Sequence, residues 1–188
     1  MLTIASWNIN SVRLRIGTVC RFLADARPDV LCLQEIKCRN GEFPEKAFKQ
    51  AGYKHMHVVG QKGWHGVAIV SRVKLEPVEA PAICPKKEAR IAAAKIDGIE
   101  VHNLYVPAGA DLPELTNPKF VHKLKVLDRM KALYKQRKAS VPTILLGDLN
   151  PDCDLGCGLS GQGGKAGYAD EKQGDLAETG EWHGRSPQ

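Results

Sequence analysis

The segment PTILLGDLN, residues 142–150, decides how this sequence is interpreted. Its aliphatic and β-branched residues predict a buried strand, and Gly147 then leads into two polar side chains, Asp148 and Asn150. Side chains two positions apart on a strand point to the same side, so these two can converge on one point while Leu149 stays in the core. The simpler alternative is that Gly-Asp-x-Asn forms an ordinary turn.

Two earlier predicted strands also end in polar side chains. LTIASWNI (2–9) reaches Asn8, and DVLCLQEI (29–36) reaches Glu35. If the three strands lie side by side, their ends form one oxygen-rich pocket, and carboxylate and amide oxygens suit the hard cation Mg²⁺. Taken singly, Asn8 could satisfy backbone groups at a strand end, and Glu35 could be a solvated partner of Lys37.

The remaining periodicity predicts an α/β protein. Ser11 is expected to cap a helix that ends before Pro28, which would give a strand, helix and strand within the first 36 residues. Asp97-Gly98 is the strongest hairpin signal in the chain. Further elements are expected as helices at 44–51 and 118–138 and as antiparallel strands at 55–60 and 66–72.

Charge divides the chain into two parts. With 188 residues, of which 43% are hydrophobic, we expect one domain with a core. Residues 1–150 carry 24 basic and 14 acidic side chains, a net charge of +10, whereas residues 151–188 carry a net charge of −4 and nine of the 18 glycines. The basic part suggests a polyanionic partner, although a solvated lysine face would look the same. The Gly-rich acidic tail is expected to be loop-rich or disordered.

Several classes of protein are not favoured by the sequence. The first residues do not resemble a secretory signal, and no apolar run is long enough to cross a membrane, so a soluble cytoplasmic protein without membrane contact is expected. The six cysteines are irregularly spaced and several lie in apolar runs, as expected of reduced thiols. Neither a disulfide framework nor a zinc site is expected.

Five ordered blocks carry a resemblance to a known family. WNINSVR, LCLQEIK, GQKGWHGVAIVS, NLYVPAG and LLGDLN resemble the exonuclease III branch of the endonuclease/exonuclease/phosphatase superfamily. This branch comprises bacterial Mg²⁺-dependent abasic-site endonucleases and 3′-to-5′ exonucleases of DNA repair. The resemblance covers residues 1–150 and implies a monomeric DNA-repair phosphodiesterase that uses Mg²⁺, with Mn²⁺ as a second candidate.

The resemblance assigns roles to the polar strand ends. It implies that Asn8, Glu35, Asp148 and Asn150 hold the metal ion. Tyr105 would lie near the scissile phosphate, Asp148 would position or deprotonate the attacking water, and Asn150 would stabilise the charge that develops on the phosphate oxygens. Without the resemblance, Tyr105 could equally be a half-buried strand tyrosine.

The resemblance also implies contacts with duplex DNA that carries abasic sites or 3′ ends. Arg90, in EARIAAAK, and the QKGWH loop with Lys62 and Trp64 lie where the family contacts the DNA backbone. Lys62 and Trp64 could instead form a solvent-exposed loop tip.

The resemblance ends at Asn150. Family members continue for about a hundred further residues, which supply a late Asp and a terminal Asp-His pair, whereas here Trp182 precedes His183. We therefore expect an incomplete four-layer α/β sandwich of the deoxyribonuclease I type, with the second sheet largely missing and an apolar face partly uncovered. One hypothesis is that residues 151–188 are translated out of the ancestral reading frame.

Three functions remain open from the sequence. The first is a Mg²⁺-dependent abasic-site endonuclease and 3′-to-5′ exonuclease that is truncated, with reduced or no activity. The second is a noncatalytic DNA-binding remnant, and the third is a superfamily phosphatase that acts on a small phosphoester. The basic charge of residues 1–150 argues against the third.

Overall fold

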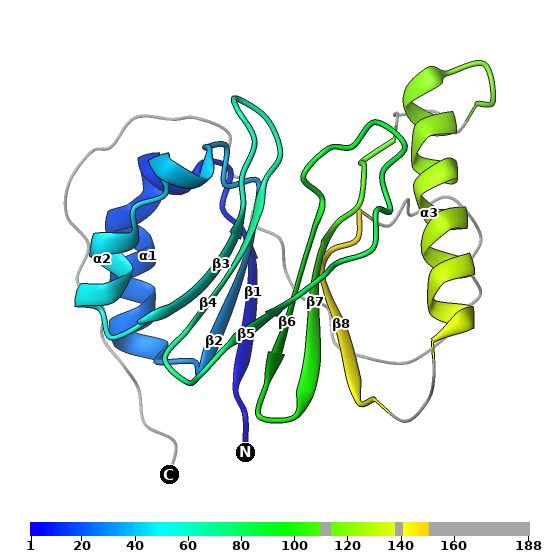
Figure 1. Cartoon of the computed structure of the whole chain (residues 1–188). Coiled ribbons are helices and arrows are strands. Elements are labelled where there is room, and N and C mark those ends of the chain that lie inside the picture. Colours follow the sequence, from blue (N-terminus) through cyan, green and yellow to red (C-terminus); the bar gives the residue numbers. More distant parts are fainter. Residues whose placement is uncertain (110–113, 138–140, 151–188) are drawn as a thin grey trace, which may run out of the picture. The chain divides into compact units, whose positions relative to one another are not determined.

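The computed structural model describes residues 1–109, 114–137 and 141–150. These residues form two four-stranded sheets, in the orders β1-β2-β4-β3 and β5-β6-β7-β8 (Figure 1). The strands are β1 Ile4–Asn8, β2 Val30–Gln34, β3 His55–Val59, β4 Val67–Ser71, β5 Glu76–Val78, β6 Ile91–Ile96, β7 Ile99–Tyr105 and β8 Thr143–Asp148. The helices are α1 Val12–Ala26, α2 Glu45–Gln50 and α3 Pro118–Gln136, with a short 3₁₀ turn at Asn40–Glu42.

Three hydrophobic clusters stack these elements into four layers. The first, which includes Leu23, Leu33 and Phe48, joins α1 and α2 to the first sheet. The second lies between the two sheets and is formed by Val30, Cys32, Val67, Ile69, Leu75, Ala92, Ala94, Ile96 and Val101. The third, Ile83, Ile91, Leu104 and Val126, joins the second sheet to α3. Successive strand residues point to opposite faces, so β2 places Leu33 toward the helices and Cys32 toward the second sheet. The predicted four-layer α/β sandwich is confirmed.

The expectation that the second sheet is largely missing was wrong. The second sheet has four strands, because the Asp97-Gly98 hairpin forms β6 and β7 there and β8 pairs in parallel with β7. Period-two alternation identifies a strand and its buried face, but it does not identify the strand's partner. β8 lies at the sheet edge, where Leu145 and the following Leu149 are 45% and 47% exposed, in agreement with an apolar face that is partly uncovered.

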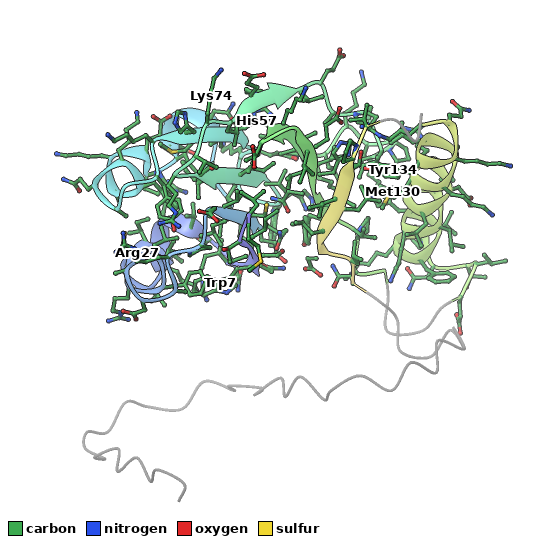
Figure 2. All side chains as sticks on the ribbon, turned by 90° about the horizontal axis from the view of Figure 1, so that it is seen from below. Trp7, Arg27, His57, Lys74, Met130 and Tyr134 are labelled. Atoms are coloured by element: carbon green, nitrogen blue, oxygen red, sulfur yellow. The ribbon has the colours of Figure 1, made fainter. Side chains whose placement is uncertain are left out.

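The helix ends follow the sequence signals only in part. Ser11 precedes α1 with φ 85° and its side chain makes no capping hydrogen bond, so the predicted cap was wrong. At α3 the Asn117 side chain accepts from the backbone N–H of Lys119 at 3.0 Å, and Pro118 occupies the first helical position. Met130 and Tyr134 extend from α3 toward the second sheet (Figure 2).

The tail predicted for residues 151–188 lies outside the described residues and stays a prediction. Within the described parts of the chain, none of the helices is long and apolar enough to pass through a membrane.

A buried amide joins the two sheets. Asn103, on β7, is fully buried and donates through Nδ2 to the carbonyl oxygens of Leu33 at 2.9 Å and Ala68 at 3.0 Å, both in the first sheet. Gln34 Nε2 donates to Asn103 Oδ1 at 2.6 Å. Apolar packing between sheets is non-directional, whereas these hydrogen bonds have fixed geometry. They therefore set how β2 and β4 lie against β7.

Gly147 brings β8 close to β7 directly before Asp148. It has φ 130°, and a Cβ atom at this position would lie 2.0 Å from the carbonyl oxygen and 2.7 Å from the amide nitrogen of Leu104. Both contacts are with backbone atoms of the neighbouring strand, so no side-chain rotation could relieve them. Only glycine fits here without displacing β8.

We expect Gly147→Ala to lower the free energy of unfolding by about 2–4 kcal/mol, because both the clash and the positive φ oppose a side chain. Urea unfolding followed by circular dichroism would measure this. The matched control is Gly17→Ala in α1, where nothing lies within 4 Å of the added Cβ, and it should be neutral or stabilising by up to about 1 kcal/mol. Equal midpoints for wild type and Gly147→Ala would contradict the close strand approach.

Candidate active site

Two parallel strand pairs end at the same place in the molecule. In the first sheet Asn8 pairs with Gln34 at the ends of β1 and β2, so Glu35 follows directly beside Asn8. In the second sheet Tyr105 pairs with Asp148 at the ends of β7 and β8. The two sheets therefore present amide, carboxylate and phenol groups from their carboxyl-terminal strand ends.

These side chains meet across the gap between the sheets. Asn8 Nδ2 donates to Glu35 Oε1 at 2.9 Å and to Asp148 Oδ2 at 2.7 Å. Tyr105 OH donates to the same Glu35 oxygen at 2.9 Å. The sequence argument required the three strand ends to lie side by side without assigning them to sheets, and the structure places β1 and β2 in the first sheet and β8 in the second. The predicted neighbours nevertheless come together, through contacts between sheets.

Glu35 is held as a carboxylate by its surroundings. Burial alone raises its pKa, but hydrogen bonds from Asn8, Lys37 and Tyr105 outweigh this and lower the pKa below the ordinary value. Lys37 Nζ lies 3.0 Å from Glu35 Oε2. The backbone of Glu35 is left-handed, with φ 51°, a conformation that costs a non-glycine residue about 1–3 kcal/mol and is concentrated at functional sites.

Tyr105 stays protonated at neutral pH. Burial, and next the hydrogen bond to Glu35, raise the pKa of its hydroxyl above the usual range, so it acts as a hydrogen-bond donor. The Arg90 guanidinium lies 4.8 Å from the centre of the Tyr105 ring, and Arg90 Nη1 donates to the Tyr105 carbonyl oxygen at 3.3 Å. Arg90 Nε also donates to Glu88 Oε2 at 2.6 Å. Arg90 therefore positions Tyr105 through contacts with both its ring and its backbone carbonyl.

Asn150 lies beside Asp148 but points elsewhere. Its backbone N–H donates to Asp148 Oδ1 at 3.1 Å, whereas its side-chain Nδ2 donates to the Val106 carbonyl oxygen at 2.8 Å. Lys123 Nζ, buried on α3, donates to the Asn150 carbonyl oxygen at 2.6 Å. Asn150 therefore holds Asp148 through its backbone, and its predicted roles at the metal ion and the phosphate stay predictions.

The residues predicted to contact DNA differ in exposure. Arg90 is 5% exposed and is engaged by Glu88 and Tyr105, whereas Lys62 is exposed and Trp64 is 70% exposed in the loop between β3 and β4. Lys37 Nζ lies 5.6 Å from the Trp64 ring centre, which connects this loop to Glu35. The contacts of Arg90 favour a positioning role, and DNA binding by all three residues stays a prediction.

Sequence reasoning gave no role to Lys123, which the structure places against Asn150. Position 123 lies three residues after Phe120 and three before Val126, on the buried face of α3. A lysine that interrupts an apolar helical stripe was the available signal, because a charged side chain is rarely buried without partners. Lys123 also donates to the Ala108 carbonyl oxygen at 3.2 Å.

Comparison with known proteins gives consistent matches. The model of the endonuclease/exonuclease/phosphatase family matches residues 5–156. Exodeoxyribonuclease III of Haemophilus influenzae is 32% identical over 163 residues, which cover 81% of this chain and 60% of that protein. Recombination repair protein 1 of Drosophila melanogaster is 31% identical over 155 residues, covering 79% of this chain and 22% of that protein.

Solved structures agree with these matches. An AP endonuclease from Archaeoglobus fulgidus has a TM-score of 0.71 and 39% identity, and a 3′ phosphatase from Neisseria, solved with a product DNA hairpin, has a TM-score of 0.69 and 33% identity. Each comparison covers 80% of this chain and 58% of the solved chain. The chain therefore spans less than two thirds of the length of these relatives.

We expect Tyr105→Phe to raise the pKa of Glu35 toward the ordinary value of a glutamate, because the change removes a donor to the charged carboxylate. The side-chain carboxyl ¹³C shift of Glu35, followed against pH by NMR, would measure it. Tyr134→Phe is the matched control, since that hydroxyl contacts His102 Nδ1 at 2.8 Å instead. A Glu35 titration that is the same in Tyr105→Phe and wild type would disprove the contact.

Proposed function

Because the chain belongs to the endonuclease/exonuclease/phosphatase family, we propose that it carries part of a Mg²⁺-dependent phosphodiesterase that acts on duplex DNA in repair, at abasic sites and 3′ ends. The observation that carries this proposal is the meeting of Asn8, Glu35, Tyr105 and Asp148 at hydrogen-bond distances across two sheets. Relatives named as exodeoxyribonuclease III and AP endonuclease support it.

The donor atoms suit a hard divalent cation. Glu35 and Asp148 offer carboxylate oxygens, the ligands that Mg²⁺ prefers and Mn²⁺ also accepts. Asn8 donates through Nδ2 to both carboxylates here, and it would offer its amide oxygen to an ion once its side chain turned over. Glu35 is already ionised, although its Oε2 atom pairs with Lys37, so an ion there would share or replace that contact. When bound, such an ion would stabilise negative charge on the phosphate oxygens as a Lewis acid.

The side chains themselves supply the proton chemistry. Asp148 is fixed by Asn8 through one oxygen and by the Asn150 backbone through the other, so it can orient a water molecule and accept its proton. Tyr105, neutral and positioned by Arg90, can donate a hydrogen bond to a phosphate oxygen. Each of these groups would then have one task in phosphodiester hydrolysis.

Attraction to DNA would come from charge and from the exposed loop. Residues 1–150 carry a net charge of +10, which favours a polyanion without regard to sequence and weakens with salt. Lys62 and Trp64 are exposed in the loop that the contact between Trp64 and Lys37 connects to Glu35, and they would offer a phosphate contact and a stacking surface. The monomeric state and the cytoplasmic location stay predictions from the sequence.

The chain aligns with only part of the length of its full-length relatives. The aligned residues span 60% of exodeoxyribonuclease III of Haemophilus influenzae. We therefore take residues 1–150 as the N-terminal part of the catalytic domain and expect activity far below that of the full-length relatives. The late Asp and the Asp-His pair that the resemblance implies have no counterpart in this sequence.

A second candidate is removal of a phosphate from DNA 3′ ends. The Neisseria structure that resembles this chain is named a 3′ phosphatase and contains a product DNA hairpin. The same carboxylate, amide and phenol groups could hydrolyse a phosphomonoester, since the charge that develops on the phosphate oxygens is similar. A substrate with a 3′-terminal phosphate would separate the two candidates.

The test is cleavage of a duplex that carries one abasic site, by the purified 188-residue chain. We expect slow nicking that requires Mg²⁺, stops with EDTA and falls about 10²- to 10⁴-fold in Asp148→Asn. Asp128→Asn on the exposed side of α3 is the matched control and should behave as wild type.

The same assay can also show DNA binding without cleavage. Salt-sensitive duplex binding that Asp148→Asn leaves unchanged, with no cleavage at any Mg²⁺ or Mn²⁺ concentration, would replace the proposal with a noncatalytic DNA-binding protein.

A further inference from the structure

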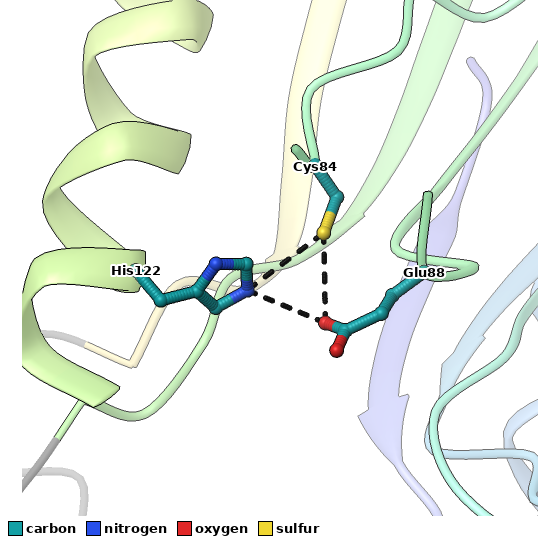
Figure 3. A group of neighbouring side chains, drawn as sticks. All are labelled: Cys84, Glu88 and His122. Carbon is teal, nitrogen blue, oxygen red and sulfur yellow. Dashed lines mark hydrogen bonds and ion pairs between the residues drawn. The ribbon is translucent and has the colours of Figure 1, made fainter. Parts of the chain in front are cut away.

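A second cluster of metal-ligating side chains lies outside the site described above. Cys84 and Glu88 come from the segment between β5 and β6, and His122 comes from the second turn of α3 (Figure 3). Cys84 Sγ, one Glu88 oxygen and one His122 nitrogen all lie within 4.8 Å of one another. Cys84 is 3% exposed and His122 8% exposed. The cluster therefore joins the edge of the second sheet to α3.

The separations between the three atoms match the edges of a zinc tetrahedron. Cys84 Sγ lies 3.7 Å from His122 Nε2 and 3.5 Å from Glu88 Oε2, and the latter two atoms are 3.4 Å apart. Zinc bonds of about 2.3 Å to sulfur and about 2.0–2.2 Å to nitrogen or oxygen, at tetrahedral angles, give ligand separations of roughly 3.4–3.6 Å. Three ligands could bind one ion here with only small shifts.

The same geometry argues against a nucleophilic cysteine. In a cysteine, histidine and carboxylate triad, the thiol and the carboxylate contact opposite nitrogens of the imidazole ring. Here Cys84 and Glu88 both face His122 Nε2. All three groups therefore point at one common position, as ligands do around a metal ion.

Two of the ligands are in the protonation states that a metal ion requires. Burial lowers the pKa of His122, so its ring is neutral at pH 7. Burial on its own raises the pKa of Glu88, but the contacts with Arg90 outweigh it and bring the pKa to about 2. A neutral imidazole and an ionised carboxylate are thus present before an ion arrives.

Arg90 does not exclude an ion from this position. It donates to Glu88 Oε2 at 2.6 Å, and carboxylates that bind metal ions are commonly hydrogen-bonded in this manner by a neighbouring group. His65 Nε2 lies 3.7 Å from the other Glu88 oxygen and fixes the carboxylate further. Access exists as well, because Cys84, Glu88 and Arg90 line a pocket of 450 Å³.

We propose that Cys84, Glu88 and His122 form a binding site for a borderline divalent ion of the zinc class, with one position left for water. It differs in chemistry from the cluster of Asn8, Glu35 and Asp148, whose oxygen atoms suit Mg²⁺, since thiolate and imidazole favour zinc. A bound ion would tie the segment before β6 to α3. Glu88 also accepts a hydrogen bond from Arg90, which positions Tyr105, so an ion bound by Glu88 would be linked to the active-site tyrosine through Arg90.

Cobalt(II) is the probe for the first experiment, because thiolate ligation and tetrahedral geometry give it characteristic absorption bands. The protein is the full chain with Cys153→Ser and Cys157→Ser, so that neither tail cysteine contributes. We expect one Co²⁺ per chain with a thiolate charge-transfer band, displaced by Zn²⁺ and not by Mg²⁺. Cys84→Ser should remove that band, and His122→Gln should weaken binding at least about 10-fold.

Matched controls and a measurement on the unaltered protein complete the test. Cys20→Ser and His55→Gln, at half-buried positions elsewhere, should bind Co²⁺ as the parent does. In the unaltered chain, Zn²⁺ should slow alkylation of Cys84 at least about 10-fold and leave Cys20 unchanged, as read by mass spectrometry. Absence of a thiolate band, or equal Zn²⁺ protection of both cysteines, would overturn the proposal.

Discussion

The structure depends on side-chain amides that cross from one sheet to the other. Asn103 fixes β7 against β2 and β4 from inside the core, and Asn8 links Glu35 of the first sheet to Asp148 of the second. Buried polar groups are costly when unpaired and specific when satisfied, so these contacts favour one relative position of the sheets. The apolar layer between the sheets supplies cohesion but permits sliding. The candidate active site therefore exists only when the sheets are in register.

Much of this arrangement could be predicted from local sequence. The strands that end at Asn8 and Glu35, the Asp97-Gly98 hairpin and the helix after Asn117 all follow from alternation, turn chemistry and helical spacing. The convergence of Asn8, Glu35 and Asp148 was also expected. The membership of β8 in the second sheet was not, because alternation defines a buried face without naming the strand that lies beside it. The same limit explains why the second sheet itself was underestimated.

Other features were beyond sequence reasoning because they depend on tertiary neighbours. Gln34 and Asn103 are 69 residues apart and look like ordinary polar residues in strands until the sheets pack. Cys84, Glu88 and His122 have no metal-binding spacing in the sequence, since His122 comes from another element 38 residues after Cys84. Lys123 received no role from the sequence, because its two carbonyl partners lie in loops distant in sequence.

In the proposed function, Asn8, Glu35 and Asp148, from two different sheets, surround one site for a hard cation. Paramagnetic broadening by Mn²⁺, recorded by NMR on the chain at substoichiometric metal, measures this directly, because broadening falls off steeply with distance from the ion. We predict that the Asn8 side-chain amide and the Glu35 and Asp148 carboxyl signals broaden together and first, and that excess Mg²⁺ restores them. Broadening of only one of the three, or of none, would contradict it.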